Sequence, residues 1–298
     1  MNEKKISQEF KDLQKRICKD LEKLDGLGIF HFDDWKREGG GGGKTNILQN
    51  GDLLEKGGVA FSEVFGKVND EMRKQLNFTS GSQFYATGIS IVLHPKSPHI
   101  PIIHMNVRYF QMDNDIYWFG GGIDLTPHYV IPSHAKLFHQ RLKKICDRYD
   151  ETFYPKFKKQ ADEYFFIPHR NETRGIGGIF YDHLSENNTK LSKDDLLKLA
   201  LDLGDHFVEI YSEQAQFGRN LPITQREILW QNLRRGRYVE FNLVNDRGTK
   251  FGLYSNGRTE SILMSLPPTA NWQYDYIPEE HSREYDTLYF LKNNFIEI

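Results

Sequence analysis

The spacing of apolar residues changes along the chain and separates helical from strand-forming stretches. Over residues 5–25, apolar side chains recur at every third or fourth position, and Gly26 ends the pattern. From Phe84 to Phe119 the period shortens to two, in the runs FYATGISIVLH, IIHMNVRYF and DIYWF. The pattern predicts an amphipathic helix within residues 1–28, followed by an antiparallel meander of strands.

Helical patterns follow the meander, and turn-rich segments come after them. Residues 134–165 and 193–215 predict two long helices, and a shorter helix begins at a capping box from Thr224 to Glu227 and is expected to stop at Gly236. The segments RYVEFNLV, NDRG, TKFGLY, SNGR and TESILM then predict two further hairpins. Two blocks of strands with helices between them indicate an α+β fold on a large, mostly antiparallel sheet.

A run of five glycines, Gly39–Gly43, interrupts the patterned segments. Such a run holds regular structure only at a high entropic cost. A phosphate-binding P-loop would need a glycine where Glu38 stands, so nucleotide binding is disfavoured. We interpret residues 36–46 as a mobile glycine-rich loop within a single domain that spans residues 1–298.

Composition and charge exclude several classes of protein. The chain has 298 residues with 39 basic and 41 acidic side chains, so it lacks the basic excess that non-specific nucleic-acid binding requires. No apolar run is long enough to span a membrane, and the charged N-terminus does not resemble a secretory signal. The two cysteines, Cys18 and Cys146, form no metal or disulfide pattern. We expect a cytoplasmic protein with no nucleic-acid partner and no integral membrane segment.

Strand alternation separates a core face from a polar face. In IIHMNVRYF the residues Ile103, Met105, Val107 and Tyr109 share one face, so the residues between them lie on the other. If the preceding strand pairs with this one, the polar face gathers Ser90, His94, His104, Asn106 and Arg108. A solvated outer face is the commoner arrangement, but those faces usually carry Lys, Glu and Thr. These side chains form directional hydrogen bonds, which favours a binding site.

Arginines beside glycines indicate an anionic ligand. Asp124 follows three glycines in GGGIDLTP, and arginines stand near glycines in RNETRGIGG, RRGRYVEF, NDRGT and SNGRTES. They are Arg170, Arg174, Arg234, Arg235, Arg237, Arg247 and Arg258. Arginine pairs with carboxylates and phosphates through two parallel bonds. Each turn taken alone is explained by a hairpin, so the hypothesis of a polyanionic ligand rests on their number.

Histidines give a weaker indication of a metal site. His94 and His104 lie on neighbouring predicted strands and could share a divalent ion, with His139 and His169 as further ligands. No H-x-x-x-H or H-E-x-x-H pair is present, and a single histidine is more often a structural residue. No G-x-S-x-G motif is present, and Cys18 and Cys146 lie in predicted helices and not at a strained turn, so the sequence gives little support for nucleophilic catalysis.

Long segments of the chain resemble the oxygen-dependent coproporphyrinogen III oxidases. They are HPKSPHIPIIHMNVRYF, WFGGGIDLTPHY, HRNETRGIGGIFYD and RRGRYVEFNLVNDRGTKFGLYSNGRTESILMSLPP, and the similarity extends from about Ile29 to Tyr276. The resemblance implies oxidative decarboxylation of two of the four propionates of coproporphyrinogen III to vinyl groups in haem biosynthesis. The products would be protoporphyrinogen IX, carbon dioxide and hydrogen peroxide, with dioxygen as co-substrate and no organic cofactor. It also implies a sheet flanked on both sides by helices.

The resemblance also assigns roles to individual residues. His104 matches the proposed proton donor, Asp124 matches a carboxylate thought to face the pyrrole N–H groups, and Arg108 is our third catalytic candidate. The substrate-binding positions would be Ser90, Asn106, Val107, Arg108, Asn256, Gly257 and Arg258. Many members of the family carry glycine where this chain has Asn256. Two interpretations of Asp246 stay open: a charge-bearing role, and a position in a hairpin turn.

The resemblance also implies a candidate metal site and an oligomeric state, and two other functions stay open beside it. Bacterial members are described with a divalent cation such as Mn²⁺ at four histidines, which correspond to His94, His104, His139 and His169, whereas eukaryotic members are described without a metal. The family forms homodimers, and the interface would include about residues 238–273. Two alternatives stay open: a His-ligated metal oxygenase with another aromatic substrate, and a non-catalytic binder of tetrapyrroles or other anions.

Overall fold

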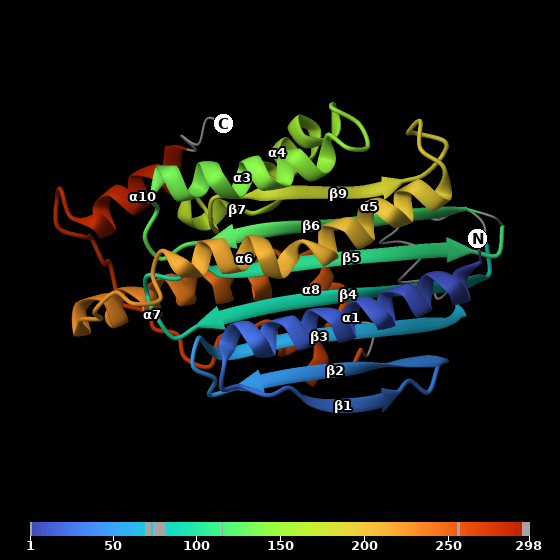
Figure 1. Cartoon of the computed structure of the whole chain (residues 1–298), viewed down its shortest axis with the longest axis horizontal. Coiled ribbons are helices and arrows are strands. Elements are labelled where there is room, and N and C mark those ends of the chain that lie inside the picture. The colour runs from blue at the N-terminus through green and yellow to red at the C-terminus, as the bar shows by residue number, and fades with distance from the viewer. Residues whose placement is uncertain (1, 69–72, 74–80, 115, 255–256, 294–298) are drawn as a thin grey trace.

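Seven antiparallel strands form the centre of the molecule, in the order β1-β2-β3-β4-β5-β6-β9 (Figure 1). The computed structural model describes residues 2–68, 73, 81–114, 116–254 and 257–293. The strands of the sheet are β1 (His31–Lys36), β2 (Gly41–Gln49), β3 (Leu54–Lys67), β4 (Gln83–Pro95), β5 (Ile102–Met112), β6 (Tyr117–Thr126) and β9 (Gly178–Leu184). A separate two-stranded pair consists of β7 (Phe166–Ile167) and β8 (Glu172–Thr173). The predicted meander is thus confirmed as β4, β5 and β6.

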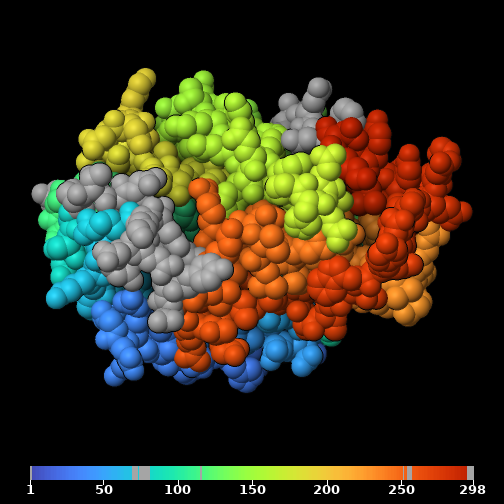
Figure 2. Space-filling view, turned by 180° about the vertical axis from the view of Figure 1, so that it is seen from behind, coloured from blue at the N-terminus to red at the C-terminus, as the bar shows by residue number. Residues whose placement is uncertain are grey.

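Helices cover both faces of this sheet, as the α+β prediction requires. On the face nearer the viewer in Figure 1 lie α1 (Glu3–Asp25), α3 (Pro132–Cys146), α5 (Lys193–Asp205) and α6 (Phe207–Gln216), and α4 (Phe153–Tyr164) packs on β9. The other face, turned toward the viewer in Figure 2, carries α7 (Gln225–Glu240), a π-helix (Phe241–Asn245), α8 (Arg247–Tyr254) and α9 (Thr259–Leu263). Helix α10 (Arg283–Asn293) follows near the C-terminus. In the described part of the chain, no helix is long and apolar enough to cross a bilayer.

The apolar face of the sheet and helix α1 build the main core. Ile103, Met105, Val107 and Tyr109 are all fully buried, which confirms the predicted alternation of β5. The apolar stripe of α1 lies in the same hydrophobic cluster. The Asn2 side chain accepts the Lys5 N–H at the start of this helix, and Gly26 ends it in a left-handed conformation.

The glycine run forms a β-hairpin, so the predicted loop over residues 36–46 is wrong. Gly41–Gly43 lie inside β2, where they pair with Val64, Glu63 and Ser62 of β3. A side chain at Gly41 would collide with the backbone of Glu63. These glycines therefore serve close backbone packing in a sheet.

The segment after Gly236 is helical, and the two predicted hairpins are wrong. Helix α7 continues past this glycine to Glu240, and the π-helix, α8 and α9 follow. The NDRG sequence is a helix start in place of a hairpin turn, because Asp246 Oδ2 accepts the Thr249 N–H at 2.7 Å. The long helix expected over residues 134–165 is likewise two helices, α3 and α4.

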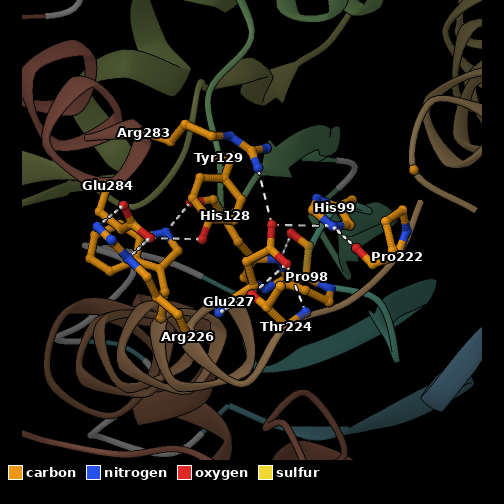
Figure 3. Close-up of polar contacts among 12 residues, drawn as sticks. Pro98, His99, His128, Tyr129, Pro222, Thr224, Arg226, Glu227, Arg283 and Glu284 are labelled. Atoms are coloured by element: carbon orange, nitrogen blue, oxygen red, sulfur yellow. Dashed lines mark hydrogen bonds and ion pairs between the residues drawn. The ribbon is translucent and has the colours of Figure 1, made fainter. Parts of the chain in front are cut away.

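A polar cluster fastens α7 and α10 to the end of the sheet (Figure 3). The predicted capping box is confirmed, since Thr224 and Glu227 each bond the other's backbone N–H. Glu227 also lies 3.1 Å from Arg283 Nη1 and 3.4 Å from His99 Nε2. The Arg283 guanidinium stacks on the Tyr129 ring at 4.0 Å. These contacts fix the start of α7, which then runs across the polar face of the sheet.

Candidate functional site

Small residues line the centre of the polar face. Across the strands, Ala60, Ser90, Asn106 and Gly122 stand in one row of paired positions, and Ser62, Gly88, Arg108 and Gly120 stand in the next. Paired residues of neighbouring strands project from the same face. We call the small members of these rows the glycine floor: Ala60, Ser62, Gly88, Ser90, Gly120 and Gly122. The floor gives the sheet a flat surface from which Asn106 and Arg108 project.

Aromatic clusters lie at both ends of this floor. At one end Phe84, Phe110 and Trp118 pack together, with Phe110 and Trp118 stacked at 4.3 Å. At the other end Phe165 packs with Phe241 in a separate cluster. A flat apolar ligand with polar substituents would meet aromatic rings at its edges and hydrogen-bonding side chains over its surface.

His104, Asp124 and Arg174 form a hydrogen-bonded series of side chains that runs from beside the floor into the protein. His104 Nδ1 lies 2.8 Å from Asp124 Oδ1, and Arg174 Nη2 donates to Asp124 Oδ2 at 2.6 Å. Asp124 and Arg174 are 2% and 3% exposed, whereas the His104 side chain is 22% exposed. Burial alone would raise the pKa of Asp124, but the Arg174 charge and the hydrogen bond with His104 outweigh it and lower that pKa. Asp124 is therefore an ionised acceptor that orients the His104 ring.

Aromatic rings surround Arg174 and hold its guanidinium in place. The centre of the guanidinium lies 4.4 Å from the Phe165 ring and 4.6 Å from each of the Tyr238 and Phe241 rings. Its Nη1 donates to Asn242 Oδ1 at 2.9 Å. Each contact stabilises the cation, so Arg174 is fixed before any ligand arrives.

Arg108 is held between two acceptors on the floor. Its Nη1 donates to Asn106 Oδ1 at 2.7 Å, and its Nη2 lies 3.0 Å from Asp182 Oδ2. The Asn106 amide is itself oriented, because its Nδ2 donates to the Ile89 carbonyl. Ser90 pairs with Asn106 in the register, so three of the predicted binding residues are brought together.

The remaining predicted binding positions are placed differently. The Val107 side chain is fully buried on the opposite face, in the main core, and it cannot reach a ligand on the floor. Arg258 forms an ion pair with Asp33 of β1, with Gly257 beside it in the chain. Asn256 lies outside the described residues. Asp246 accepts the Tyr164 hydroxyl at 2.7 Å besides capping α8.

The four predicted metal ligands do not converge. His94 Nε2 lies 2.8 Å from the Ser265 carbonyl, and His169 Nε2 lies 2.9 Å from Glu240. His139 is buried with both ring nitrogens engaged, by Tyr154 and by the Ile176 carbonyl. Burial lowers the pKa of His94 to about 3 and that of His139 to about 4, so both rings are neutral. Among the described residues, no group of three or more His, Cys, Asp or Glu side chains is arranged to hold a metal ion.

Sequence reasoning missed Asp182 and Asn242 as partners of the site arginines. Asp182 pairs with Arg108 although it was not a candidate, and Arg174 was noted only as one of several arginines. The alternation of β9 places Asp182 on the polar side, but this requires knowing that β9 pairs with β6. Asn242 likewise reaches Arg174 from the π-helix, which the sequence pattern did not predict.

The α+β fold presents a floor of small residues beside Arg108 and between two aromatic clusters, an arrangement that suits a flat ligand bearing carboxylates. The chain belongs to the coproporphyrinogen III oxidase family, whose model matches residues 5–295. An oxygen-dependent coproporphyrinogen-III oxidase of Prochlorococcus marinus (strain MIT 9312) is 47% identical to it, over 91% of this chain and 86% of the relative. The protein of the same name from strain NATL2A is 46% identical, over 92% of this chain and 84% of the relative. The resemblance seen in the motifs is thus confirmed.

Proposed function

We propose that this chain is an oxygen-dependent coproporphyrinogen III oxidase that binds its substrate on the glycine floor. In each of two rounds, a propionate, dioxygen and one proton give a vinyl group, carbon dioxide and hydrogen peroxide. Family membership supports the reaction. The observation that carries the site is the order of the rows: the row with Ser90 and Gly122 lies between the row of Arg108 and the His104–Asp124 pair.

The shape and charge of the floor suit a flat tetracarboxylate. The macrocycle would lie over Ser90 and the glycines, whose small size allows a close approach to the sheet. Arg108 and Arg258 would each bind a propionate, because a guanidinium presents two parallel donors to a carboxylate. Dioxygen would react with the electron-rich macrocycle itself, so the proposal needs no organic cofactor.

His104 is placed to supply the proton. Its Nδ1 is bonded to ionised Asp124, which favours the tautomer with the proton on that nitrogen. Its Nε2 would then exchange a proton at the floor. Both oxygens of Asp124 are engaged inside the protein, so the geometry supports a role through His104 more than a direct contact with pyrrole N–H groups.

A divalent cation such as Mn²⁺ remains a proposal that rests on the resemblance. The present contacts of His94, His104, His139 and His169 do not fit one shared ion, because carbonyls, a tyrosine and carboxylates already bond their ring nitrogens. Both cysteines are free and buried, which is compatible with the proposed cytoplasmic location.

The proposed homodimer would use the helical layer around residues 238–273. In this range Leu243, Val244 and Trp272 are 44%, 55% and 51% exposed. Exposed apolar residues that gather in one layer are typical of an interaction surface. Leu243 and Val244 lie in the π-helix and Trp272 lies in the segment between α9 and α10, whereas the sequence pattern predicts strands in this range.

Oxygen consumption with coproporphyrinogen III as the only reductant tests the function, and Arg108→Ala tests the site. We expect the variant to raise KM at least about tenfold, because it removes a charge-assisted bond to a carboxylate. Arg141→Ala is the matched control, since it breaks an ion pair with Glu213 on the helical side. A non-catalytic binder would bind the porphyrin and consume no oxygen, and an unchanged KM in Arg108→Ala would remove Arg108 from the site.

A further inference from the structure

Arg108 and Asp182 meet across an intervening strand. They lie on β5 and β9, which β6 separates, and yet Arg108 Nη2 is 3.0 Å from Asp182 Oδ2. Gly120 of β6 makes this approach possible. A Cβ atom at this position would lie 2.8 Å from Arg108 Nη2 and 2.7 Å from Asp182 Oδ1. The absence of a side chain at Gly120 thus leaves the space in which Arg108 and Asp182 pair.

The backbone holds the Asp182 carboxylate in position. Its Oδ1 accepts the N–H of His183 at 3.0 Å, and His183 adopts a left-handed conformation with φ of 56°. The pairing of β6 with β9 shifts register beside Gly120, between Phe119 and Gly121. An irregularity of this kind re-aims a side chain, here toward the floor.

A second arginine of the site has the same kind of partner. Arg258 forms an ion pair with Asp33, which lies on the edge strand β1. The Arg258 and Asp33 side chains are 32% and 50% exposed, and those of Arg108 and Asp182 are 35% and 28% exposed. Both arginines that the proposed function assigns to propionates are therefore neutralised by a resident carboxylate.

We propose that Asp182 is a counter-charge that weakens the hold of Arg108 on carboxylates of the substrate and product. This inference rests on the proposed function. A bound propionate must share the guanidinium with Asp182, and the repulsion between the two carboxylates lowers the affinity. Attraction that is equal for substrate and transition state lowers KM without raising kcat. Because the product keeps two propionates, unopposed arginines would also slow its release.

Asp182→Asn tests the proposal because it removes the charge and keeps the shape. The dissociation constant of coproporphyrin III, a tetracarboxylate that does not react further, is measured by fluorescence, and KM is measured with coproporphyrinogen III. We expect both to fall about twofold to fivefold in the variant, the range of a partly exposed ion pair. The dissociation constant should also rise more steeply with salt than in the wild type, because the site gains one positive charge.

Asp205→Asn is the matched control, since it removes the same charge from a surface pair with Arg16 on the helical side. It should leave the porphyrin affinity unchanged. Asp33→Asn removes the charged partner of Arg258 and should likewise tighten the binding of coproporphyrin III. It provides a second test if Asp182→Asn lowers the melting temperature. Unchanged or weaker binding of coproporphyrin III by Asp182→Asn would overturn the proposal. If Asp182→Asn is unstable, the same result in Asp33→Asn would overturn it.

Measurements on the wild type distinguish a failure of this inference from a failure of the proposed function. A wild type that consumes no oxygen with coproporphyrinogen III contradicts the function itself. An active wild type that binds coproporphyrin III as tightly as Asp182→Asn contradicts the counter-charge alone. Both the function and the inference are supported if the wild type is active and binds coproporphyrin III more weakly than Asp182→Asn, and if the variant shows the steeper salt dependence.

Discussion

Arg174 and Asp124 form an ion pair of 2.6 Å that is almost completely removed from solvent. The cation is surrounded by three aromatic rings, and the carboxylate is shared with His104. A buried pair of this kind is costly to break, because the remaining charge has no water to solvate it. The pair thus links the stability of the fold to the orientation of the proposed proton donor.

Asp124→Asn should therefore reduce both stability and turnover. Removing the carboxylate charge leaves Arg174 buried without a counter-ion, at a cost of about 3–5 kcal/mol in the free energy of unfolding. Denaturation monitored by circular dichroism measures the loss, and an oxygen-uptake assay measures kcat. The double variant Asp124→Asn/Arg174→Gln removes both charges and should regain part of the stability but none of the activity. Full activity in a stable double variant would contradict the role of Asp124.

Ser90→Phe tests the flatness of the floor directly. Ser90 is half-buried and lies opposite Asn106, so a phenyl ring there would project into the space assigned to the macrocycle. We expect kcat/KM to fall by about 100-fold, since misplacing a reacting group by 1 Å has an effect of this order. Ser90→Ala removes the hydroxyl but keeps the floor flat, so it separates the loss of a substrate contact from the loss of flatness. If Ser90→Phe folds and turns over normally, the substrate does not lie on the floor.

The polar face could be predicted from sequence because its cause is local. The period of two in β5 determines which of Met105 and Asn106 faces the core, and the alternation holds in the structure. His104 and Arg108 were placed on that face by the same pattern. Nothing beyond the strand itself was needed for this step.

Other features of the fold and of the site depend on contacts between segments that are distant in the sequence. Gly41–Gly43 resembled a loop in isolation, and their place in β2 follows from close packing against β3. The strand-like pattern after Gly236 is overridden by helix formation, to which Asp246 contributes as a cap. The pairing of Asp182 with Arg108 requires the order β5-β6-β9, which no local pattern contains.

Val244→Asp should dissociate the proposed dimer. Val244 is 55% exposed in the layer from 238–273, and a carboxylate placed in an apolar interface loses its hydration without gaining a partner. Light scattering after size exclusion, at micromolar concentration, should give a mass near 35 kDa for the variant, from the chain mass of 34.9 kDa, and twice that for the wild type. Ile29→Asp is the control, because Ile29 is 66% exposed and lies outside this range. A dimeric Val244→Asp variant would place the interface elsewhere.

Stability should fall as the pH drops below about 6.5, the usual pKa of histidine in an unfolded chain. His94, His128 and His139 are buried, and burial lowers the pKa of each in the folded protein. The unfolded chain therefore binds protons first, and each histidine contributes a loss of about 1.4 kcal/mol per pH unit. For His139 this loss ends near its folded pKa of about 4, and above pH 6.5 none of the three contributes.

The comparison of His128→Gln with the wild type isolates one of these groups. His128 is 1% exposed, and its Nδ1 lies 3.2 Å from the Pro98 carbonyl, a contact that the glutamine amide can replace. Between pH 6 and 5 most carboxylates remain ionised, so the difference in slope reports the histidine. Urea denaturation at several pH values should give a slope that is smaller in the variant by about 1.4 kcal/mol per pH unit. Equal slopes would mean that His128 takes up its proton in the folded protein as readily as in the unfolded chain.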